Sequence, residues 1–309
     1  MTAPRLPDFL IIGAMKCATT TLHRQLAAQP GLFMPDLKEP NFFSDDHQYA
    51  KGMDWYRSLF AAAQPEDQCG EASTHYTKRP TYPQACDRLH QALPTAKLIY
   101  VMRHPVERLI SHFIHEWTLH NVPKDIHRAI ATHPELIAYS QYSRQLRPYL
   151  ETFGPDRILP VFAERLFHDP QAELARICKF IGYPQFPHWV EQTGQTHRSS
   201  DRIRRNALVD ALVDPPILAA LRRRLVPKGV RSWVRRQLSM QEKPVPNPQC
   251  QQQLTEIFDA DLAVLGKWLG VPLSCDRFKA EVVKAPMTWT TATPHPSTPH
   301  PSTLPQEEP

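Results

Sequence analysis

A lysine followed by three consecutive threonines near the start of the chain has the chemistry of a phosphate-binding site. Lys16 precedes Thr19–Thr21 by three positions. The apolar run at 9–12 predicts a buried strand before this loop, and the apolar stripe after Thr19 predicts a helix. A loop that leads from a strand into a helix presents backbone N–H groups and the positive end of the helix dipole to an anion. We therefore predict that residues 16–21 bind a phosphate group, with the lysine adding a charge and the threonines adding hydroxyl donors.

The loop differs from the P-loop of nucleotide hydrolases, whose pattern is G-x-x-x-x-G-K-[ST]. Cys17 stands where that loop has a magnesium-binding serine or threonine, and Ala18 stands where a glycine is usual. The pattern thus predicts phosphate binding without a metal. The sequence also has no H-E-x-x-H and no C-x-x-C pair, which are typical zinc-binding spacings, so no metal is expected. A capped helix that binds no ligand is the alternative interpretation.

A second basic residue follows a second predicted strand. Residues 98–102 are apolar and end at Arg103, and Pro105 suits the first turn of a helix whose apolar spacing continues to Trp117. In open parallel sheets, ligands bind beyond the carboxyl ends of the strands. Because Lys16 and Arg103 each follow such an end, we expect both side chains to reach one site. Arginine suits a phosphate because its planar guanidinium can donate two hydrogen bonds at once.

The repeated order of strand, loop and helix predicts an α/β fold. A third apolar run at 158–162 predicts another strand, and Pro160 within it predicts a place near the edge of the sheet. Further helices are predicted at 83–93, 171–181, 207–225 and 249–269. We therefore expect a P-loop-like three-layer sandwich, in which helices flank both faces of a central, mostly parallel sheet.

The composition excludes several classes of protein. Of 309 residues, 41% are hydrophobic, which is enough for a substantial core, and ten are glycine, which excludes a collagen-like chain. No run approaches the roughly 18 consecutive apolar residues of a membrane span, and residues 1–7 lack a secretory pattern. We therefore predict a soluble, cytoplasmic protein. Its six cysteines show no paired spacing, so six reduced thiols are expected.

Charge and proline are each concentrated in one segment. Residues 198–236 hold eleven Lys/Arg and three acidic residues, which accounts for the net charge of +5 on the whole chain. This favours an anionic ligand over a general affinity for nucleic acid. Seven of the 32 prolines lie in residues 286–309, where a T-P-H-P-S-T repeat has no apolar face. We therefore expect one domain at 1–285 and a disordered Pro/Thr/His-rich tail at 286–309.

Five segments occur in an order that is typical of one enzyme family. They are residues 9–22, 38–43, 52–56, 70–76 and 97–113. Together they resemble sulfotransferases that use 3′-phosphoadenosine 5′-phosphosulfate (PAPS), and they are most similar to the heparan-sulfate-type branch and its bacterial relatives. The first segment is similar to the 5′-phosphosulfate loop of that family, and the last is similar to its 3′-phosphate segment. The resemblance extends from about residue 7 to residue 268.

The resemblance implies a role for each residue of the predicted phosphate site. Lys16 is expected to contact the 5′-phosphate and its bridging oxygen, and Arg103 and Ser111 are expected to hold the 3′-phosphate. The family usually has a glycine at the position of Ala18. Residues 195–200 are the counterpart of the family's C-terminal loop, and from them we assign Arg198 to the donor. The predicted donor-binding residues are Lys16, Cys17, Ala18, Thr19, Thr20, Thr21, Arg103, Ser111 and Arg198.

The resemblance also places the catalytic base in the pair Lys38–Glu39. Glu39 is predicted to take the proton of the acceptor, and two nearby phosphates are expected to raise its pKa. Lys38 is predicted to orient the acceptor or to balance charge, and with Lys16 these two complete the catalytic set. His75 and His104 are the alternative bases.

Other polar and aromatic residues in the matched segments are expected to have mainly structural roles. An aromatic cluster, made of Phe42, Phe43, Trp55, Tyr56 and Phe60, is expected for the most part to pack the core. Glu164 and Arg165 are expected to form a structural pair. A second group remains open between structure and contact with the acceptor: Glu71, Ser73 and Tyr76.

The implied function is transfer of a sulfuryl group from PAPS to a hydroxyl or amine of an acceptor by in-line displacement. The acceptor is expected to be a carbohydrate or a small metabolite, with no nucleic acid partner and no membrane span. Oligomeric state is not predicted. Two alternatives share parts of the pattern. A P-loop kinase predicts magnesium dependence and a metal-holding aspartate after the second strand. A non-enzymatic anion- or nucleic-acid-binding module would be built on residues 198–236.

Overall fold

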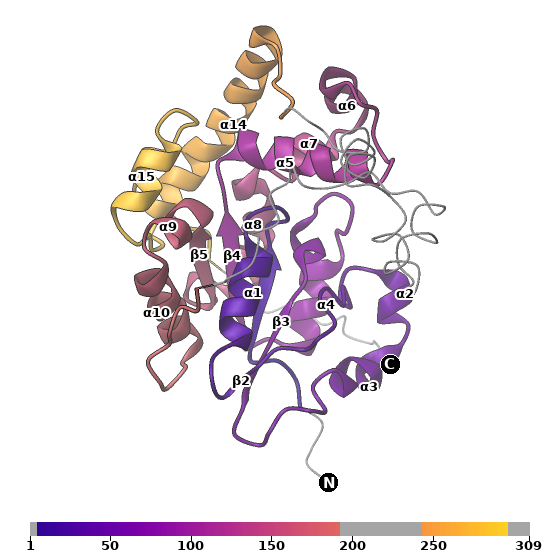
Figure 1. Cartoon of the computed structure of the whole chain (residues 1–309), viewed down its shortest axis with the longest axis vertical. Coiled ribbons are helices and arrows are strands. Elements are labelled where there is room, and N and C mark those ends of the chain that lie inside the picture. The colour runs from indigo at the N-terminus through magenta and orange to yellow at the C-terminus, as the bar shows by residue number, and fades with distance from the viewer. Residues whose placement is uncertain (1–4, 192–242, 296–309) are drawn as a thin grey trace, which may run out of the picture.

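The computed structural model describes residues 5–191 and 243–295. The predicted helix at 207–225, the basic segment 198–236 and Arg198 lie outside the described residues. Figure 1 shows the described part as strands enclosed by helices, with the C-terminal helices α14 (Pro248–Leu269) and α15 (Phe278–Lys284) on one side.

In the part of the chain that the structure describes, five parallel strands form the central sheet, in the order β2-β3-β1-β4-β5. They are β1 (Phe9–Gly13), β2 (Leu32–Phe33), β3 (Gln68–Ala72), β4 (Lys97–Met102) and β5 (Ile158–Phe162). The three strands predicted from apolar runs are confirmed. Because Pro160 lies in β5, which ends the sheet, its predicted place at an edge is confirmed as well.

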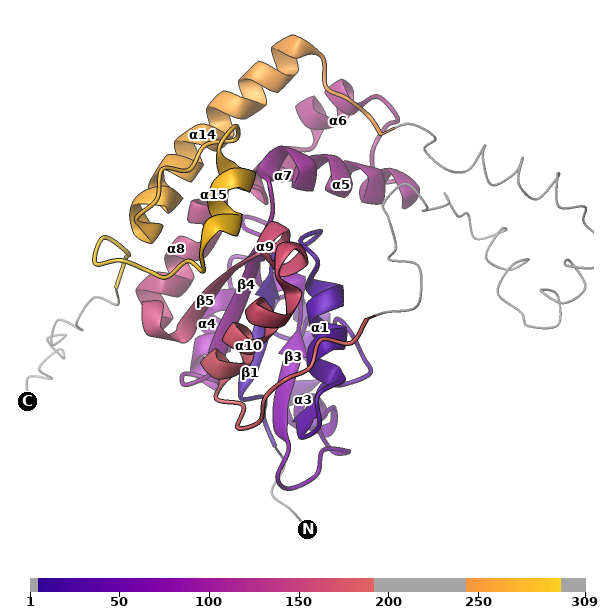
Figure 2. The same ribbon diagram turned by 60° about the vertical axis from the view of Figure 1, so that its left-hand side comes forward.

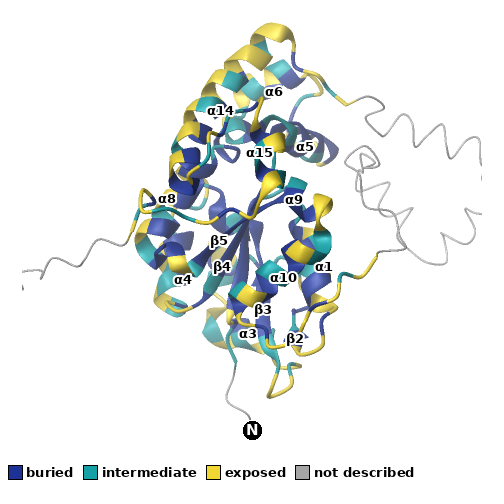
Figure 3. Ribbon diagram, turned by 90° about the vertical axis from the view of Figure 1, so that its left-hand side faces the viewer, coloured by how far each residue is buried: buried dark blue, intermediate teal, exposed yellow. Residues whose placement is uncertain are grey.

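Helices cover both faces of the sheet, which confirms the three-layer architecture. Helices α4 (Ala85–Ala92) and α8 (Tyr142–Phe153) lie on one face, and α1 (Thr19–Ala27) and α10 (Pro170–Ile181) lie on the other (Figure 3). This double cover explains the sequence of the central strand, since Phe9, Leu10, Ile11 and Ile12 are all fully buried. A strand that is covered on both faces reads as a continuous apolar run.

The helices that were predicted from apolar spacing are confirmed within a few residues in α1, α4, α5, α10 and α14. The described chain also contains shorter helices. Of the five helices just named, α5 spans Pro105–Thr118. The shorter elements are α2 (Asp46–Tyr49), α3 (Gly52–Ser58), η1 (Thr74–Thr77), α6 (Ile126–Thr132), α7 (Glu135–Ala138), η2 (Pro155–Arg157) and α9 (Ala163–His168).

Strand β3 has a polar sequence that apolar spacing does not reveal. Gly70 is required there because a Cβ atom would come within 2.2 Å of the Phe9 ring on the neighbouring strand. Glu71 is buried and accepts hydrogen bonds from the hydroxyls of Tyr56 at 2.9 Å and Tyr76 at 2.8 Å. The strand thus buries a carboxyl group whose Oε2 accepts from both tyrosines, while its Oε1 is a buried atom that they do not reach.

The first part of the predicted tail is packed, so the predicted domain boundary at residue 285 is too early. Met287 is buried, and the indole N–H of Trp289 donates to the Ile158 carbonyl at 2.6 Å. The Thr293 hydroxyl donates to the Trp268 carbonyl at 3.0 Å. The physical reason is that residues 286–293 still carry large apolar side chains, whereas the repeat that lacks them begins at Thr293. Residues 296–309 lie outside the described residues.

The predicted aromatic cluster belongs to the core. Phe42, Phe43, Tyr56 and Phe60 are at most 2% exposed, and Trp55 is partly buried against them. The rings of Phe42 and Tyr56 stack at 4.6 Å. The predominantly structural role predicted for this cluster is therefore confirmed.

The six cysteines are free thiols, five of them buried. Among the described helices, none combines the length and the apolar composition that crossing a bilayer would take. Within the same residues, no group of three or more His, Cys, Asp or Glu side chains is arranged to hold a metal ion.

Candidate active site

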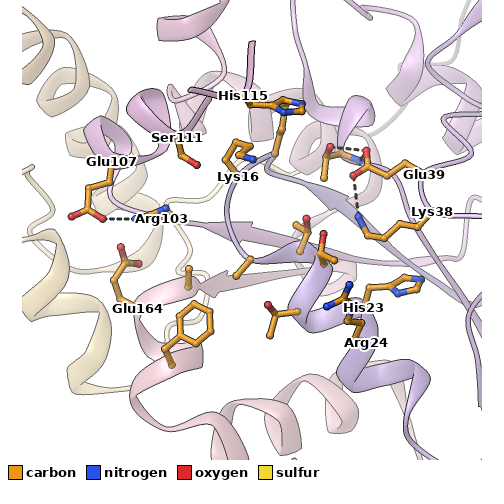
Figure 4. Close-up of a pocket in the computed structure, with 18 of the residues that line it drawn as sticks. Lys16, His23, Arg24, Lys38, Glu39, Arg103, Glu107, Ser111, His115 and Glu164 are labelled. Atoms are coloured by element: carbon orange, nitrogen blue, oxygen red, sulfur yellow. Dashed lines mark hydrogen bonds and ion pairs between the residues drawn. The ribbon is translucent and has the colours of Figure 1, made fainter. Parts of the chain in front are cut away.

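A large cleft opens beyond the carboxyl ends of β1 and β4 (Figure 4). Its volume of about 1630 Å³ exceeds the roughly 300–1,000 Å³ of a site for one small ligand. Lys16 and Arg103 both line it, as expected for two residues that follow neighbouring parallel strands. The predicted site residues that line the cleft are Lys16, Ala18, Thr19, Thr20, Thr21, Lys38, Glu39, Arg103 and Ser111.

The loop between β1 and α1 is shaped to receive an anion. Lys16 and Ala18 both have left-handed backbone conformations, with φ of 71° and 65°. Ala18 is the N-cap residue of α1, and no side chain of the described residues caps this helix. The N–H groups of the first turn, which belongs to Thr19–Thr21, are therefore available to a ligand in the cleft. A glycine is suited to the conformation of Ala18, which gives a physical reason for the family pattern at this position.

Cys17 does not belong to this anion-binding set. Its side chain is fully buried, with Sγ 3.8 Å from the Tyr142 hydroxyl, and its amide donates to the Ala14 carbonyl at 3.2 Å. Burial raises the pKa of the thiol to about 12, against a smaller opposing effect of the Arg108 charge. The prediction that Cys17 contacts the donor is therefore wrong, because the left-handed residues on either side turn it into the core.

Arg103 and Ser111 come from the turn after β4 and from the helix that follows. Pro105 begins α5, and Ser111 lies farther along that helix on the side of the cleft. The guanidinium of Arg103 forms an ion pair with Glu107 at 2.7 Å, and Glu107 also pairs with Lys279 of α15. Burial acts to raise the pKa of Glu107, but hydrogen bonds from Lys279 and Arg103 outweigh it and lower the pKa to about 2. Glu107 is therefore ionised at neutral pH.

Glu164 and Arg165 are structural, but they do not pair with each other. Glu164 accepts a hydrogen bond from the His104 amide at 2.9 Å, which ties the start of α9 to the turn after β4, and it also lines the cleft. Arg165 instead pairs with Glu173 of α10 at 3.2 Å. The expected pair is therefore replaced by two separate contacts that hold neighbouring elements together.

Glu39 is held at the opposite end of the cleft by two neighbours. Lys38 Nζ lies 3.0 Å from Glu39 Oε1, and the amide and hydroxyl of Thr74 donate to Oε2 at 2.9 Å and 2.7 Å. Ser73 accepts a hydrogen bond from the Asn41 amide at 2.9 Å. The segment that carries the pair Lys38–Glu39 is thus joined to the end of β3, which fixes the direction of the carboxylate.

Among the described residues, the neighbours of Glu39 lower its pKa. The expected rise concerns the phosphates of a bound donor, so it stays a prediction. Burial acts to raise the pKa, but the positive charge of Lys38 and the hydrogen bonds from Thr74 act in the other direction and prevail. Glu39 is therefore an ionised carboxylate at neutral pH, with the protonation state that a proton acceptor needs.

The two alternative bases differ in position. His75 lines the cleft, and burial and the charge of Lys78 lower its pKa to about 4, so its ring is neutral at pH 7. His104 is not among the residues that line the cleft. Its Nε2 lies 3.0 Å from the Cys275 carbonyl and its ring packs on Phe278. The structure therefore retains His75 as an alternative and removes His104.

Several residues that line the cleft were not predicted from the sequence. His23 and Arg24 follow Thr20 by three and four positions on α1, and His115 follows Ser111 by four on α5. A helical spacing of three or four from a predicted site residue is the signal that could have found them. Figure 4 shows their side chains around the same cleft as Lys16 and Glu39. Thr74 was not predicted because only the folded chain brings it to Glu39.

Lys78 is a buried cation at the same end of the cleft as Glu39. It is 9% exposed, it lines the cleft, and within the described part of the chain it forms no ion pair within 4 Å. Burial lowers its pKa to about 8, although the charge of Glu39 acts in the opposite direction. At neutral pH this lysine therefore offers a positive charge to a ligand.

The remaining undecided residues, Glu71, Ser73 and Tyr76, are structural. All three are at most 1% exposed and none is among the residues that line the cleft. Burial raises the pKa of Glu71 to about 7, and hydrogen bonds from Ser73, Tyr76 and Tyr56 act against that rise.

The fold and this cleft define an α/β protein with an anion-binding loop beyond the carboxyl ends of its strands, and sequence comparison assigns the family. The model of the sulfotransferase domain family matches residues 6–255. This match covers most of the chain, so the chain belongs to the sulfotransferase domain family.

Individual relatives agree with this assignment. The chain is 33% identical over 191 residues to heparan sulfate glucosamine 3-O-sulfotransferase 6 of Homo sapiens, an alignment that covers 58% of this chain and 53% of the relative. It is 34% identical over 193 residues to heparan sulfate glucosamine 3-O-sulfotransferase 3B1 of Mus musculus, which covers 58% of this chain and 46% of that protein. The chain thus spans about half the length of these curated relatives.

A solved structure shows the same fold. The sulfotransferase from Alicyclobacillus acidocaldarius superposes with a TM-score of 0.62 at 23% identity, over 87% of this chain and 98% of that one. This likeness confirms the predicted P-loop-like sandwich.

Proposed function

We propose that the protein transfers a sulfuryl group from PAPS to a hydroxyl or amine of an acceptor. The observation that carries this proposal is that one cleft holds a lysine-bearing anion loop, the pair Arg103 and Ser111, and an ionised glutamate, Glu39. Membership of the sulfotransferase domain family supports sulfuryl transfer over the alternatives of a P-loop kinase and a non-enzymatic binding module.

The residues of the cleft fit the donor. PAPS carries phosphate at both its 5′ and its 3′ position, and when bound it supplies a sulfuryl group on a phosphate leaving group. The first turn of α1 has N–H groups without a side-chain cap among the described residues, which suits the 5′-phosphate. Lys16 is in place to offset the charge that develops on the leaving phosphate. Arg103 and Ser111, from the turn after β4 and from α5, suit the 3′-phosphate.

Glu39 is suited to receive the proton of the acceptor. Thr74 occupies Oε2 with two hydrogen bonds, and Lys38 contacts Oε1. The carboxylate is therefore fixed in one orientation before an acceptor arrives, which lowers the entropic cost of reaching a reactive geometry. Lys38 keeps the glutamate ionised, which is the protonation state that accepts a proton.

We further infer that the acceptor is anionic and that it is a carbohydrate or a small metabolite. The end of the cleft around Glu39 contains Lys38, Lys78 and Arg24. Against the two acidic residues that line the cleft in the same segment, Asp36 and Glu39, these three cations leave a positive balance. Such a balance favours an acceptor with carboxylate or sulfate groups of its own. The curated relatives are named as heparan sulfate enzymes, which is consistent with a carbohydrate. The cytoplasmic location stays a prediction from the first residues of the sequence.

The test is transfer of labelled sulfate from PAPS to a panel of glycans and small metabolites. We expect transfer to anionic members of the panel, and loss of transfer in Lys16→Ala. Glu39→Gln should lose turnover but still bind 3′-phosphoadenosine 5′-phosphate (PAP), the product nucleotide, in a calorimetric titration. Wild-type protein that does not bind PAP would contradict the sulfotransferase proposal. Magnesium-dependent transfer from ATP would favour the kinase instead.

A further inference from the structure

Helix α15 brings a lysine into the cleft from outside the residues that the family model matches. The match ends at residue 255, whereas Lys279 belongs to α15 (Phe278–Lys284). Figure 2 shows α15 beside α9, at the end of the sheet where β5 lies. Lys279 lines the cleft together with Arg103 and Ser111, which are the residues assigned to the 3′-phosphate.

The position of α15 is fixed by packing rather than by Lys279 itself. Phe278 is fully buried, and its ring packs at 5.7 Å from Phe162 of β5 and at 5.8 Å from His104. Arg165 donates to the Val283 carbonyl at 2.9 Å, at the other end of this short helix. The backbone of Lys279 is therefore held while its side chain, 56% exposed, reaches into the cleft.

Lys279 and Arg103 contact the same carboxylate. Glu107 uses Oε2 for Arg103 and Oε1 for Lys279. Figure 4 shows the carboxyl groups of Glu107 and Glu164 both close to Arg103, with the ion pair to Glu107 drawn as a dashed line. An arginine whose charge is cancelled by its own glutamate attracts a phosphate weakly. Because Glu107 is shared with a second cation, Arg103, Glu107 and Lys279 together carry two positive charges and one negative charge, and the carboxyl group of Glu164 also acts on Arg103.

We propose that Lys279 is a positioning residue for the donor, which acts through Glu107 to leave the charge of Arg103 available to the 3′-phosphate. This inference rests on the proposed function, because it assumes that Arg103 receives that phosphate. It adds that the C-terminal helix, outside the matched domain, contributes to selection of PAPS over adenosine 5′-phosphosulfate, which lacks the 3′-phosphate.

The test compares two nucleotides that differ by the 3′-phosphate alone. PAP and adenosine 5′-monophosphate (AMP) are titrated calorimetrically into the full chain, as wild type, Lys279→Met, Lys279→Arg and Lys284→Met. Lys284 is the matched control, because it lies in the same helix and pairs with Glu281 instead. For Lys279→Met we expect the Kd of PAP to rise about tenfold and the Kd of AMP to change less than about twofold. Lys279→Arg and Lys284→Met should bind both nucleotides as the wild type does.

A second variant tests the route through Glu107. If Lys279 acts by offsetting the negative charge of Glu107, then the double variant Lys279→Met/Glu107→Gln, which removes that charge, should recover most of the PAP affinity lost in Lys279→Met. Equal PAP affinity in wild type and Lys279→Met, a parallel loss for PAP and AMP, or no recovery in the double variant would each overturn the inference. Wild-type chain that binds no PAP would overturn the proposed function together with it, so the two failures are distinguishable.

Discussion

Thr74 donates two hydrogen bonds to one oxygen of Glu39, from its amide at 2.9 Å and from its hydroxyl at 2.7 Å. The two residues are 35 positions apart, and they meet because β3 ends beside the loop that carries Glu39. The contact links the proposed base to the sheet, and it also helps to lower the pKa of that base, against the effect of burial.

The first prediction concerns this contact. Thr74→Val keeps the shape and the amide but removes the hydroxyl, so Glu39 loses one hydrogen bond to a charged oxygen. Such a bond contributes about 1.5–3 kcal/mol, so we expect kcat to fall about tenfold to a hundredfold. The pKa of Glu39 should rise, and the acidic limb of the pH–rate profile should move to higher pH. Thr74→Ser should retain activity, and unchanged kcat in Thr74→Val would contradict the assigned role.

The second prediction concerns Lys78 and the acceptor. The pKa of Lys78 is lowered to about 8, chiefly by burial. The lysine is charged below that pH and loses its charge as pH rises through it, so only about a tenth of the molecules keep the charge at pH 9. We therefore expect the KM for an anionic acceptor to rise between pH 7 and pH 9. Lys78→Arg should lack this rise, because arginine stays charged, while the Kd of PAP should be insensitive to the change.

The third prediction concerns the left-handed residue before α1. Ala18 has φ of 65°, a left-handed conformation that costs a residue with a Cβ atom roughly 1–2 kcal/mol. Glycine avoids this strain, but its greater conformational freedom in the unfolded chain cancels about half of the gain in stability. Ala18→Gly should therefore raise the free energy of unfolding by about 0.5–1 kcal/mol, as measured by chemical denaturation. Ala28→Gly, at the other end of the helix with φ of −83°, is the control and should lower it. A loss of stability in Ala18→Gly would show that the loop does not adopt this backbone.

The fourth prediction concerns Glu71. Burial raises the pKa of its side chain to about 7. Between pH 4.5 and about 7 the folded protein keeps a proton that the unfolded chain has released, so stability falls as pH rises through this range. The decrease should be up to about 3 kcal/mol when unfolding is measured at pH 5 and at pH 7.5. Glu71→Gln should flatten the dependence, because the amide oxygen still accepts from Tyr56 and Tyr76 without titrating. A wild-type protein whose stability is constant over this range would contradict a raised pKa.

The sequence was sufficient for the parts of the molecule in which local pattern and burial agree. Strand β1 is covered on both faces, so its apolar run marked it, and Pro160 marked an edge because proline lacks the N–H that an inner strand would need. Strand β3 has no apolar run, and the reasons for its polar residues lie elsewhere in the chain. Tyr56 and Tyr76 donate to the buried carboxyl group of Glu71, and the Phe9 ring leaves no room for a side chain at Gly70. Cys17 was misassigned because the direction of a side chain in a loop depends on the φ angles around it.

By itself, the sequence predicted the family, the strands that precede Lys16 and Arg103, and an anion-binding loop, because these depend on residue type and on local spacing. Only the tertiary structure decided which side chains meet. It placed Thr74 on Glu39, brought Lys279 to Glu107, turned His104 away from the cleft and lowered the pKa of Glu39. The physical reason is that hydrogen bonds and charge interactions act over a few ångströms, and residues far apart in the chain come within that distance only after the sheet and its helices have packed.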